Sequence, residues 1–330
     1  MTYSSSFDWF RLARAKGIGT KSLWEVYDLI REESTNLSNF LVNQKTDVPK
    51  ISGRLRTTLK TFPHEQDYES IQRAYEQLET NRVKILHPES PDFPSKLKKY
   101  GRQYNIPPVL YARGHTPLAK SPGISIVGSR NVGEDALAIT SELAKGLAIA
   151  GFNIVSGYAK GVDSAAHLGA LEAEGTTTIV LSLGILNFEA KKEFKPFFTA
   201  YNTLVLSQFN PSEKWLARNA MARNKLVCAL ADAVVVIASG QEIDSKGRMS
   251  GTFDAARSAM AMNIPVFVLS PNGLAQPPIG NSDLIQLGCH EISVENGVQQ
   301  ITSVLDRRDS VNENKDLSTE TVQLSLLTSS

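Results

Sequence analysis

The 330-residue sequence has little cysteine, no long hydrophobic run and almost no net charge, and each absence excludes a class of protein. Cys228 and Cys289 are its two cysteines, which are too few for a disulfide scaffold. Neither lies at a short metal-binding spacing from a histidine. We therefore expect no bound metal and no other cofactor.

Hydrophobic stretches of membrane length are also missing. The apolar stretch 229–238 is interrupted by Asp232 and is far shorter than the roughly 20 residues of a membrane helix. The first ten residues lack the basic and apolar regions of a secretory signal. The sequence therefore predicts a cytoplasmic protein that makes no membrane contact.

The overall charge gives no indication of a polyanionic partner. Lysine and arginine number 35 against 34 acidic residues, for a formal net charge of +1. Many nucleic-acid-binding proteins carry a global basic excess, so any polyanion site in this chain must be local. The composition, 42% hydrophobic and 21% charged, is that of a folded globular protein, and the length predicts about two domains.

The N-terminal region reads as helical. Two short helices are predicted within 7–31, because Gly17 and Gly19 permit a tight turn between them. This pattern is typical of a helix-hairpin-helix (SAM-like) unit, which can contact DNA or serve as a packing surface. A longer helix is predicted over 64–82, where apolar residues recur at spacings of three and four.

From residue 123 the chain alternates apolar strands with amphipathic helices. Near-continuous Val, Ile and Leu in the strands favours parallel strands that are covered on both faces, and hence an α/β, doubly wound, mostly parallel Rossmann-like sheet. Its function is expected at the carboxyl ends of the strands, where open α/β sheets leave a crevice. Strands are predicted at 124–128, 153–156, 177–183, 203–206, 233–238 and 265–269.

Four segments follow from these patterns. The sequence predicts an N-terminal helical domain at 1–82, a proline-rich connector with an edge strand at 83–122, the Rossmann-like domain at 123–305, and a polar, disordered tail at 306–330.

The first predicted strand exits into a loop suited to phosphate. Gly128 lets backbone N–H groups approach an anion, Ser129 adds a hydroxyl, and Arg130 adds a planar guanidinium. A helix begins near Gly133 and contributes partial positive charge. The loop is neither a dinucleotide fingerprint nor a P-loop. An ordinary strand-to-helix turn remains the alternative.

The next strand exits into a second glycine-rich loop. Gly157, Lys160 and Gly161 predict an anion-binding loop beside the first. Asp163 is expected to cap the following helix, since capping is the commoner role of Asp at a helix start. His167 lies one turn further on, and we expect it to make a structural hydrogen bond to a neighbouring loop.

Two further segments carry basic or small polar residues. In the helical run 215–225, Arg218 and Lys225 are seven residues apart and share a face, whereas Arg223 projects about 140° away from Arg218. A solvated charged face is the alternative interpretation of this run. The segment 246–252 places Ser, Gly and Thr at the start of another helix, which again suits phosphate.

The chain resembles the DNA-processing protein A (DprA/Smf) family over most of residues 10–290. The resemblance is carried mainly by Val127–Arg130, Ser156–Leu171, Arg223–Asn224 and Ser250–Thr252. It implies a Rossmann-like protein without known catalysis. Such a protein binds single-stranded DNA, protects it during natural transformation and helps to load a RecA-type recombinase. A homodimer is left open.

The resemblance also implies site residues, with Lys160 in place of the arginine that is usual in the second loop. The candidate phosphate-binding residues are Gly128, Ser129, Arg130, Gly157, Lys160, Gly161, Arg218, Arg223, Asn224, Lys225, Ser250, Gly251 and Thr252, with Asp163 and His167 as supports. We expect bases to rest on nearby apolar or aromatic groups such as Tyr158 or Phe209.

The sequence departs from the family pattern in two places. The family signature after the third strand is missing around 184–188, and the usual Ser-Glu-Phe-Pro segment reads Ser-Gln-Phe-Asn at 207–210. We also expect no winged-helix domain after residue 306, because the tail is short and polar.

Two other functions compete with DNA binding. The same loops suit a small nucleotide, either in a sensor or in an enzyme similar to phosphoribohydrolases. Those enzymes would need a carboxylate where this chain has Ala255, and Asp254, one position away, would face elsewhere. The third candidate is a protein-interaction scaffold in which the loops bind nothing.

Overall fold

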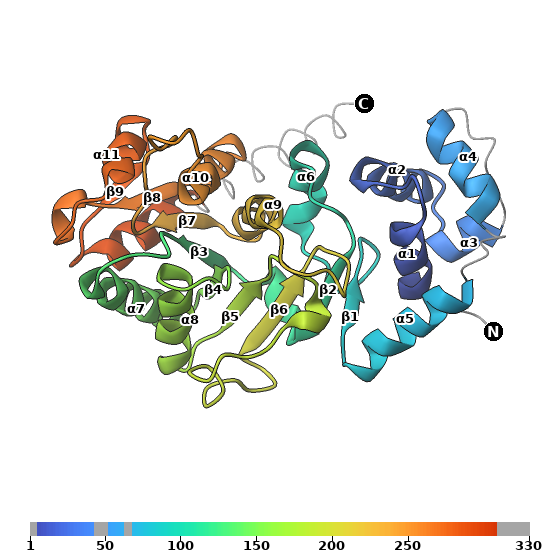
Figure 1. The fold of residues 1–330 in the computed structure, drawn as a ribbon, viewed down its shortest axis with the longest axis horizontal. Coiled ribbons are helices and arrows are strands. Elements are labelled where there is room, and N and C mark those ends of the chain that lie inside the picture. The colour runs from blue at the N-terminus through green and yellow to red at the C-terminus, as the bar shows by residue number, and fades with distance from the viewer. Residues whose placement is uncertain (1–4, 43–51, 63–67, 309–330) are drawn as a thin grey trace, which may run out of the picture.

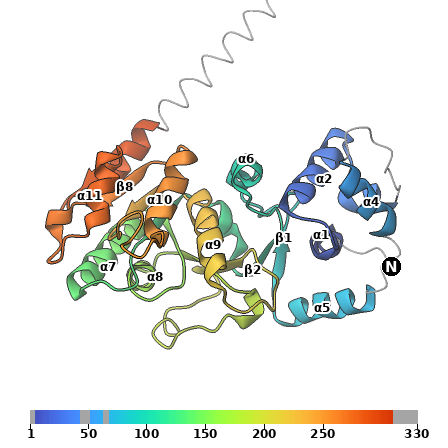
Figure 2. The ribbon, with the colours of Figure 1, turned by 45° about the horizontal axis from the view of Figure 1, so that its top comes forward.

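The computed structural model describes residues 5–42, 52–62 and 68–308. The N-terminal part is helical, as predicted, and the first two helices flank a turn in which Gly17 has a φ of 90°. Figure 2 shows these helices gathered beside β1, at the opposite end of the sheet from α11. The N-terminal helices are α1 (Ser5–Arg14), α2 (Thr20–Glu32), α3 (Leu37–Val42), α4 (Gly53–Thr61) and α5 (Tyr68–Thr80).

One nine-stranded sheet dominates the rest of the molecule (Figure 1). Its strands lie in the order β1-β2-β6-β5-β4-β3-β7-β8-β9, and every pairing from β6 to β9 is parallel. The strands are β1 (Lys84–Leu86), β2 (Leu110–Gly114), β3 (Gly123–Val127), β4 (Asn153–Ser156), β5 (Thr177–Val180), β6 (Thr203–Ser207), β7 (Ala233–Val236), β8 (Val266–Leu269) and β9 (His290–Ile292). The doubly wound, mostly parallel sheet is confirmed.

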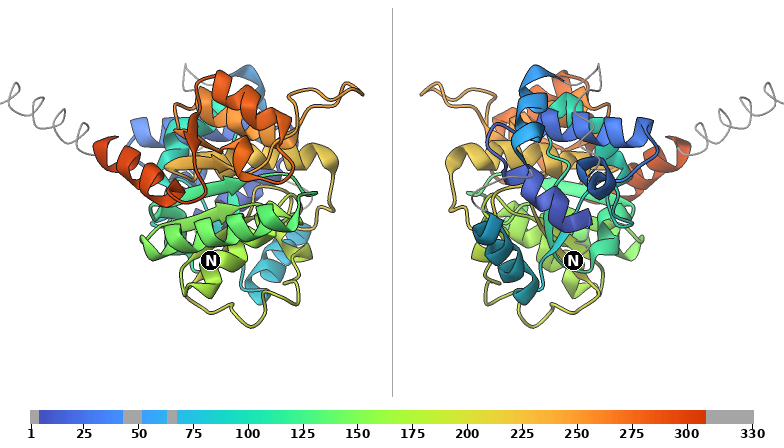
Figure 3. Two further views of the ribbon diagram at one scale, coloured as in Figure 1. Left: turned by 90° about the vertical axis from the view of Figure 1, so that its left-hand side faces the viewer. Right: turned by 90° about the vertical axis from the view of Figure 1, so that its right-hand side faces the viewer.

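Helices cover both faces of the sheet. In the left view of Figure 3, the green helix α7 lies on one side and the orange helices lie on the other. The covering helices are α6 (Ser95–Tyr104), α7 (Glu134–Ile149), α8 (Val162–Glu172), α9 (Ala217–Ala229), α10 (Gly251–Ala261) and α11 (Ile279–Gln286).

The alternation of side chains along β3 explains why both faces are apolar. Ile124 and Ile126 pack into the cluster that contains α7 and α8, whereas Val127 belongs to the cluster that contains α9 and α10. Ser125 points the same way as Val127, and its hydroxyl donates a hydrogen bond of 2.7 Å to the carbonyl of Val227 in α9. The strand is therefore buried along its whole length.

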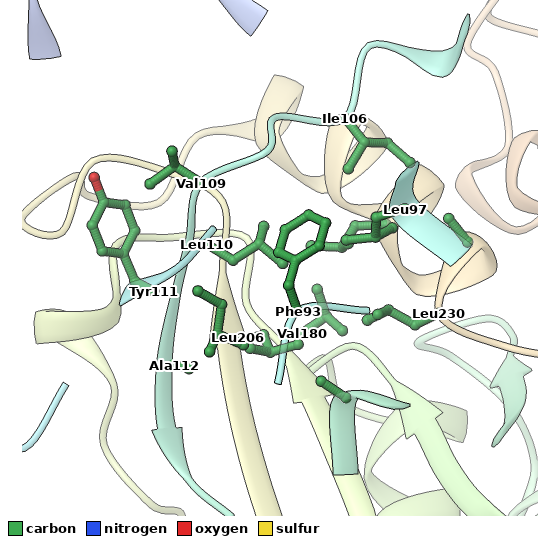
Figure 4. Close-up of a cluster of buried hydrophobic side chains, with 14 of the residues drawn as sticks. Phe93, Leu97, Ile106, Val109, Leu110, Tyr111, Ala112, Val180, Leu206 and Leu230 are labelled. Atoms are coloured by element: carbon green, nitrogen blue, oxygen red, sulfur yellow. The ribbon is translucent and has the colours of Figure 1, made fainter. Parts of the chain in front are cut away.

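Residues 83–122 contribute more to the sheet than the predicted connector and edge strand. β1 forms the edge of the sheet, whereas β2 is internal and pairs with both β1 and β6. The helix α6 also comes from this segment. Phe93 and Leu97 belong to the same buried cluster as Val180 and Leu206 of the parallel sheet (Figure 4). The α6 helix escaped prediction because only Leu97 and Gly101 within it are buried. The domain boundaries themselves stay a prediction.

The structure describes only parts of the predicted 64–82 helix and of the predicted C-terminal tail. Residues 64–67 of the predicted 64–82 helix, and 309–330 of the predicted tail, lie outside the described residues. Residues 306–308 end a helix that begins at 297. Within the described ranges, no helix is both long and apolar enough to cross a bilayer.

Candidate functional site

A cavity of about 520 Å³ opens at the carboxyl ends of β3 and β7. From β3 the chain continues through β4, β5 and β6 on one side, whereas β7 leads to β8 and β9 on the other. The cavity therefore lies at the switch point of the sheet, where the loops after two adjacent strands lead to opposite sides. Nine of the predicted site residues line it, namely Gly128, Ser129, Arg130, Asp163, Arg223, Asn224, Ser250, Gly251 and Thr252.

Contacts with neighbouring segments hold the loop after β3 in place. A Cβ atom at Gly128 would lie 2.5 Å from Cγ2 of Val162, so only glycine fits there. The backbone N–H of Ser129 donates a 2.9 Å hydrogen bond to the carbonyl of Ala238, after β7. Arg130 is exposed at the cavity and forms no ion pair with a carboxylate in the described part of the chain.

The loop after β4 packs directly on the first loop. Gly161 has a φ of +78°, and a Cβ atom there would lie 2.7 Å from the carbonyl oxygen of Ser129. Lys160 is exposed, but it is not among the residues that line the cavity. The predicted adjacency of the two loops is therefore confirmed, whereas phosphate contact through Gly157, Lys160 and Gly161 stays a prediction.

Asp163 does not cap α8, and the expectation that it would is wrong. Gly161 occupies the N-cap position, and no side chain caps this helix. The Asp163 carboxylate instead accepts a 3.3 Å hydrogen bond from the backbone N–H of Ala159, and it lies 3.6 Å from Nη1 of Arg223. Asp163 therefore supports the site by neutralising a buried cation.

Arg223 is the buried cation of the cavity, with its side chain only 7% exposed. Burial lowers the pKa of its guanidinium, while the Asp163 carboxylate opposes this change. Gly157 leaves the room that Arg223 needs, since a Cβ atom there would lie 1.7 Å from Nη1. The backbone of Gly157 therefore packs directly against the guanidinium.

The two other cations of α9 do not line the cavity. Arg218 is exposed and Lys225 is half-buried, so Arg223 faces away from both, as the helical spacing predicts. Asn224 links α9 to the next loop, because its side-chain amide donates a 2.9 Å hydrogen bond to the carbonyl of Gly251.

The start of α10 forms the wall opposite the first loop. Ser250 is its N-cap, and its hydroxyl accepts a 3.3 Å hydrogen bond from the backbone N–H of Phe253. Gly251 and Thr252 form the first turn and line the cavity, so the partial positive charge of the helix is directed towards it.

His167 behaves as predicted. Its ring nitrogens lie 2.5 Å from the carbonyl oxygen of Gly157 and 2.6 Å from the hydroxyl of Thr177. Burial lowers the pKa of His167 to about 4, so the imidazole is neutral at pH 7. The residue holds the second loop in place and does not reach the cavity lining.

Sequence reasoning missed several lining residues on the hairpin before α10. Arg248 lies on the cavity, and its guanidinium forms a 2.7 Å ion pair with Asp244. The sequence feature that could have identified Arg248 as a site residue is its position two residues before the Ser250–Thr252 segment. Met221, Met249, Asn131 and Gln241 also line the cavity and belong to no recognised motif.

Neither Tyr158 nor Phe209 lines the cavity, and the expectation that bases rest on them stays a prediction. The Tyr158 ring packs 5.3 Å from the Phe188 ring between centroids. Lys191 lies over the Tyr158 ring at 4.4 Å and donates a 2.8 Å hydrogen bond to the hydroxyl of Ser164. Tyr158, in the loop after β4, therefore packs against the loop after β5.

The charges of the cavity favour an anion. Three arginines line it against two carboxylates, and each carboxylate is paired with an arginine. Ala255 faces the cavity, whereas Asp254 does not line it. No group of three or more His, Cys, Asp or Glu residues suited to a metal occurs within residues 5–42, 52–62 and 68–308.

The fold and the cavity define a Rossmann-like α/β protein with a cationic switch-point site. A family model described as DNA recombination-mediator protein A matches residues 84–305. The chain therefore belongs to this family.

Curated relatives support the same assignment. DNA processing protein DprA of Streptococcus pneumoniae is 32% identical over 205 residues, which cover 62% of this chain and 66% of that protein. Protein Smf of Synechocystis is 31% identical over 227 residues, which cover 67% of this chain and 54% of that protein. The matched region thus spans about half to two thirds of the length of these relatives.

Two solved structures are similar in fold. The X-ray structure of DNA processing protein A from Streptococcus pneumoniae matches with a TM-score of 0.69 and 22% identity, covering 92% of this chain and 98% of that chain. The structure of DNA processing protein A from Helicobacter pylori, whose description concerns its single-stranded DNA binding mode, matches with a TM-score of 0.53 and 30% identity, covering 67% of this chain and 96% of that chain.

Proposed function

We propose that the chain binds single-stranded DNA and that the phosphates of the strand occupy the switch-point cavity. The observation that carries this proposal is the convergence of Arg130, Arg223 and Arg248 with the N-terminal turn of α10 on one cavity. A backbone phosphate there would be near guanidinium groups and near the backbone N–H groups of the first turn of α10. The Helicobacter pylori relative, described by its single-stranded DNA binding mode, supports this choice of ligand.

The cavity favours binding over catalysis in this proposal. Asp163 and Asp244 are both engaged with arginines, so neither stands ready as a general base. Ala255 occupies the position where a phosphoribohydrolase-like enzyme would need a carboxylate. We infer a protein that holds a strand without cleaving it.

The partner proposed for the bound strand is a RecA-type recombinase. The family description, DNA recombination-mediator protein A, supports this inference. In this account the protein protects incoming single strands during natural transformation and then delivers them to the recombinase. We also propose that the protein can form a homodimer. The turn at Gly17 is proposed as a further contact with DNA.

A salt titration tests the proposal. Fluorescence anisotropy with a labelled 20-nucleotide single strand measures the affinity at several salt concentrations. If four to six phosphates are held, the logarithm of the binding constant falls with the logarithm of salt concentration at a slope of about −3 to −4, since each phosphate contributes about −0.7. The affinity should be similar for unrelated sequences, because phosphate contacts carry no base information.

Competition distinguishes the alternatives in the same assay. Unlabelled single strand should displace the probe, whereas duplex and nucleoside monophosphates should do so only at far higher concentrations. A binding constant that is independent of salt contradicts the proposal. Displacement by mononucleotides at concentrations similar to the single strand would favour the nucleotide sensor instead.

A further inference from the structure

A second cavity, of about 390 Å³, adjoins the first at the same end of the sheet. The two cavities share four wall residues, which belong to the loop after β3 and to the loop after β7. These shared residues are Ser129, Asn131, Gly240 and Gln241. The two cavities are therefore direct neighbours.

The second cavity has the chemistry of a site for a neutral, planar and partly polar group. Its apolar surface comes from Val132, Leu274, Pro277, Pro278 and Ile279, and the Ile279 side chain is 61% exposed. A flat ring can pack on such a surface.

Amide groups supply the polar contacts. Asn131, Gln241 and Gln276 line the cavity, and no described residue hydrogen-bonds their side-chain amides. Each amide offers both donors and an acceptor, which match the mixed hydrogen-bonding edge of a nucleobase.

The second cavity is unsuited to phosphate. No lysine or arginine is among its lining residues, and the carboxylate of Asp135 is. This carboxylate accepts a 2.7 Å hydrogen bond from the backbone N–H of Ala275, which lowers its pKa. A negative charge fixed at this wall repels a phosphate and leaves a neutral base unaffected.

Hydrogen bonds and close packing hold the α11 side of the cavity against the loop after β7. Buried Asn281 in the first turn of α11 donates 2.8 Å hydrogen bonds to the carbonyls of Ile237 and Leu269, and it accepts one of 2.8 Å from the backbone N–H of Ser239. A Cβ atom at Gly280 would lie 2.0 Å from the carbonyl oxygen of Gly240, so α11 sits directly on the shared wall. A preformed wall of this kind loses little conformational entropy on binding.

We infer that the second cavity is a subsite for a nucleobase of the same strand whose phosphates occupy the switch-point cavity. The inference rests on the proposed function and deepens it. The phosphates would lie beside the arginines of the first cavity, and one base would lie in the second cavity. The base would stack on Ile279 and hydrogen-bond to Gln276 and its neighbouring amides.

The test compares two ligands and two variants by fluorescence anisotropy on the full chain. The ligands are a labelled 20-nucleotide thymidine strand and an abasic strand with the same number of phosphates. The test variant is Gln276→Ala with Ile279→Ala, both at exposed positions. The control is Ile149→Ala, whose side chain is 71% exposed at the other end of α7 and outside both cavities.

We expect the double variant to bind the thymidine strand at least about fivefold more weakly than wild type, the smallest effect typical of losing one stacked base. Its affinity for the abasic strand and its salt slope should be unchanged, because no cation has been removed. The Ile149→Ala control should match wild type with both ligands.

Equal weakening with both strands, or no weakening with either, overturns the inference. Failure of the proposed function looks different, since wild type itself would then bind neither strand or would bind without a salt slope. Thermal unfolding midpoints of the variants that match wild type confirm that folding is intact.

Discussion

Replacing Asp163 with alanine should destabilise the protein more than an ordinary surface change, because it leaves Arg223 charged and buried without compensation. The two side chains are 8% and 7% exposed, and 3.6 Å separates the paired oxygen and nitrogen. Nε of Arg223 is also buried without a hydrogen-bond partner among the described residues. The Asp163 carboxylate is therefore the group that mainly balances this charge.

The magnitude follows from the cost of breaking a buried ion pair. Removing one partner typically costs about 3–5 kcal/mol of unfolding free energy. Asp163→Ala also removes the 3.3 Å hydrogen bond from Ala159, and one side of the pair opens to the cavity. These two effects oppose each other, so we expect a loss near the lower end, about 3 kcal/mol.

Urea unfolding of three variants measures the coupling directly. Asp163→Ala, Arg223→Met and the double variant are compared with wild type, and Glu172→Ala, exposed on the same helix, serves as the control. The double variant should be more stable than Asp163→Ala alone, because it no longer buries a charge. A loss below about 1 kcal/mol for Asp163→Ala, or a double variant that loses the sum of the two single losses, refutes the reasoning.

Three further predictions concern neighbouring groups. Arg130→Ala should weaken binding of all single strands alike and make the salt slope shallower by about 0.7, whereas Lys145→Ala, exposed on α7, should change neither in the same titration. Gly157→Ala should cost about 1–3 kcal/mol in urea unfolding, since its Cβ would lie 1.7 Å from Arg223, and wild-type stability would contradict that packing. Burial lowers the pKa of His167 from 6.5 to about 4, so between these two pH values the unfolded chain binds more protons than the folded chain. The unfolding free energy should then fall by about 1.4 kcal/mol per pH unit as pH drops through this range, and His167→Gln should flatten that fall in urea titrations at several pH values.

The strands were predictable because each contains adjacent Ile, Val, Leu or Phe residues. All six predicted strands match β3 to β8 within a few residues, since a strand buried on both faces favours apolar side chains on both sides. The β9 strand was missed because His290 and Glu291 are exposed on it. Its position follows only from its pairing with β8.

The site was only partly predictable for a related reason. The loops at Gly128 and Ser250 were found because glycine, hydroxyl and arginine residues cluster in sequence at strand and helix ends. The pairing of Asp163 with Arg223 links residues 60 positions apart, so local capping rules gave the wrong role. The second cavity uses residues 274 and 276–279, which carry no motif and meet the loops after β3 and β7 only through tertiary packing.

A structure of the complex with a short single-stranded oligonucleotide tests the central claim most directly. We expect backbone phosphates in the switch-point cavity, with an oxygen within hydrogen-bonding distance of Arg130 or Arg223 and another facing the backbone N–H groups of Gly251 and Thr252. An oligonucleotide bound elsewhere, with the cavity holding no phosphate of the strand, would contradict it.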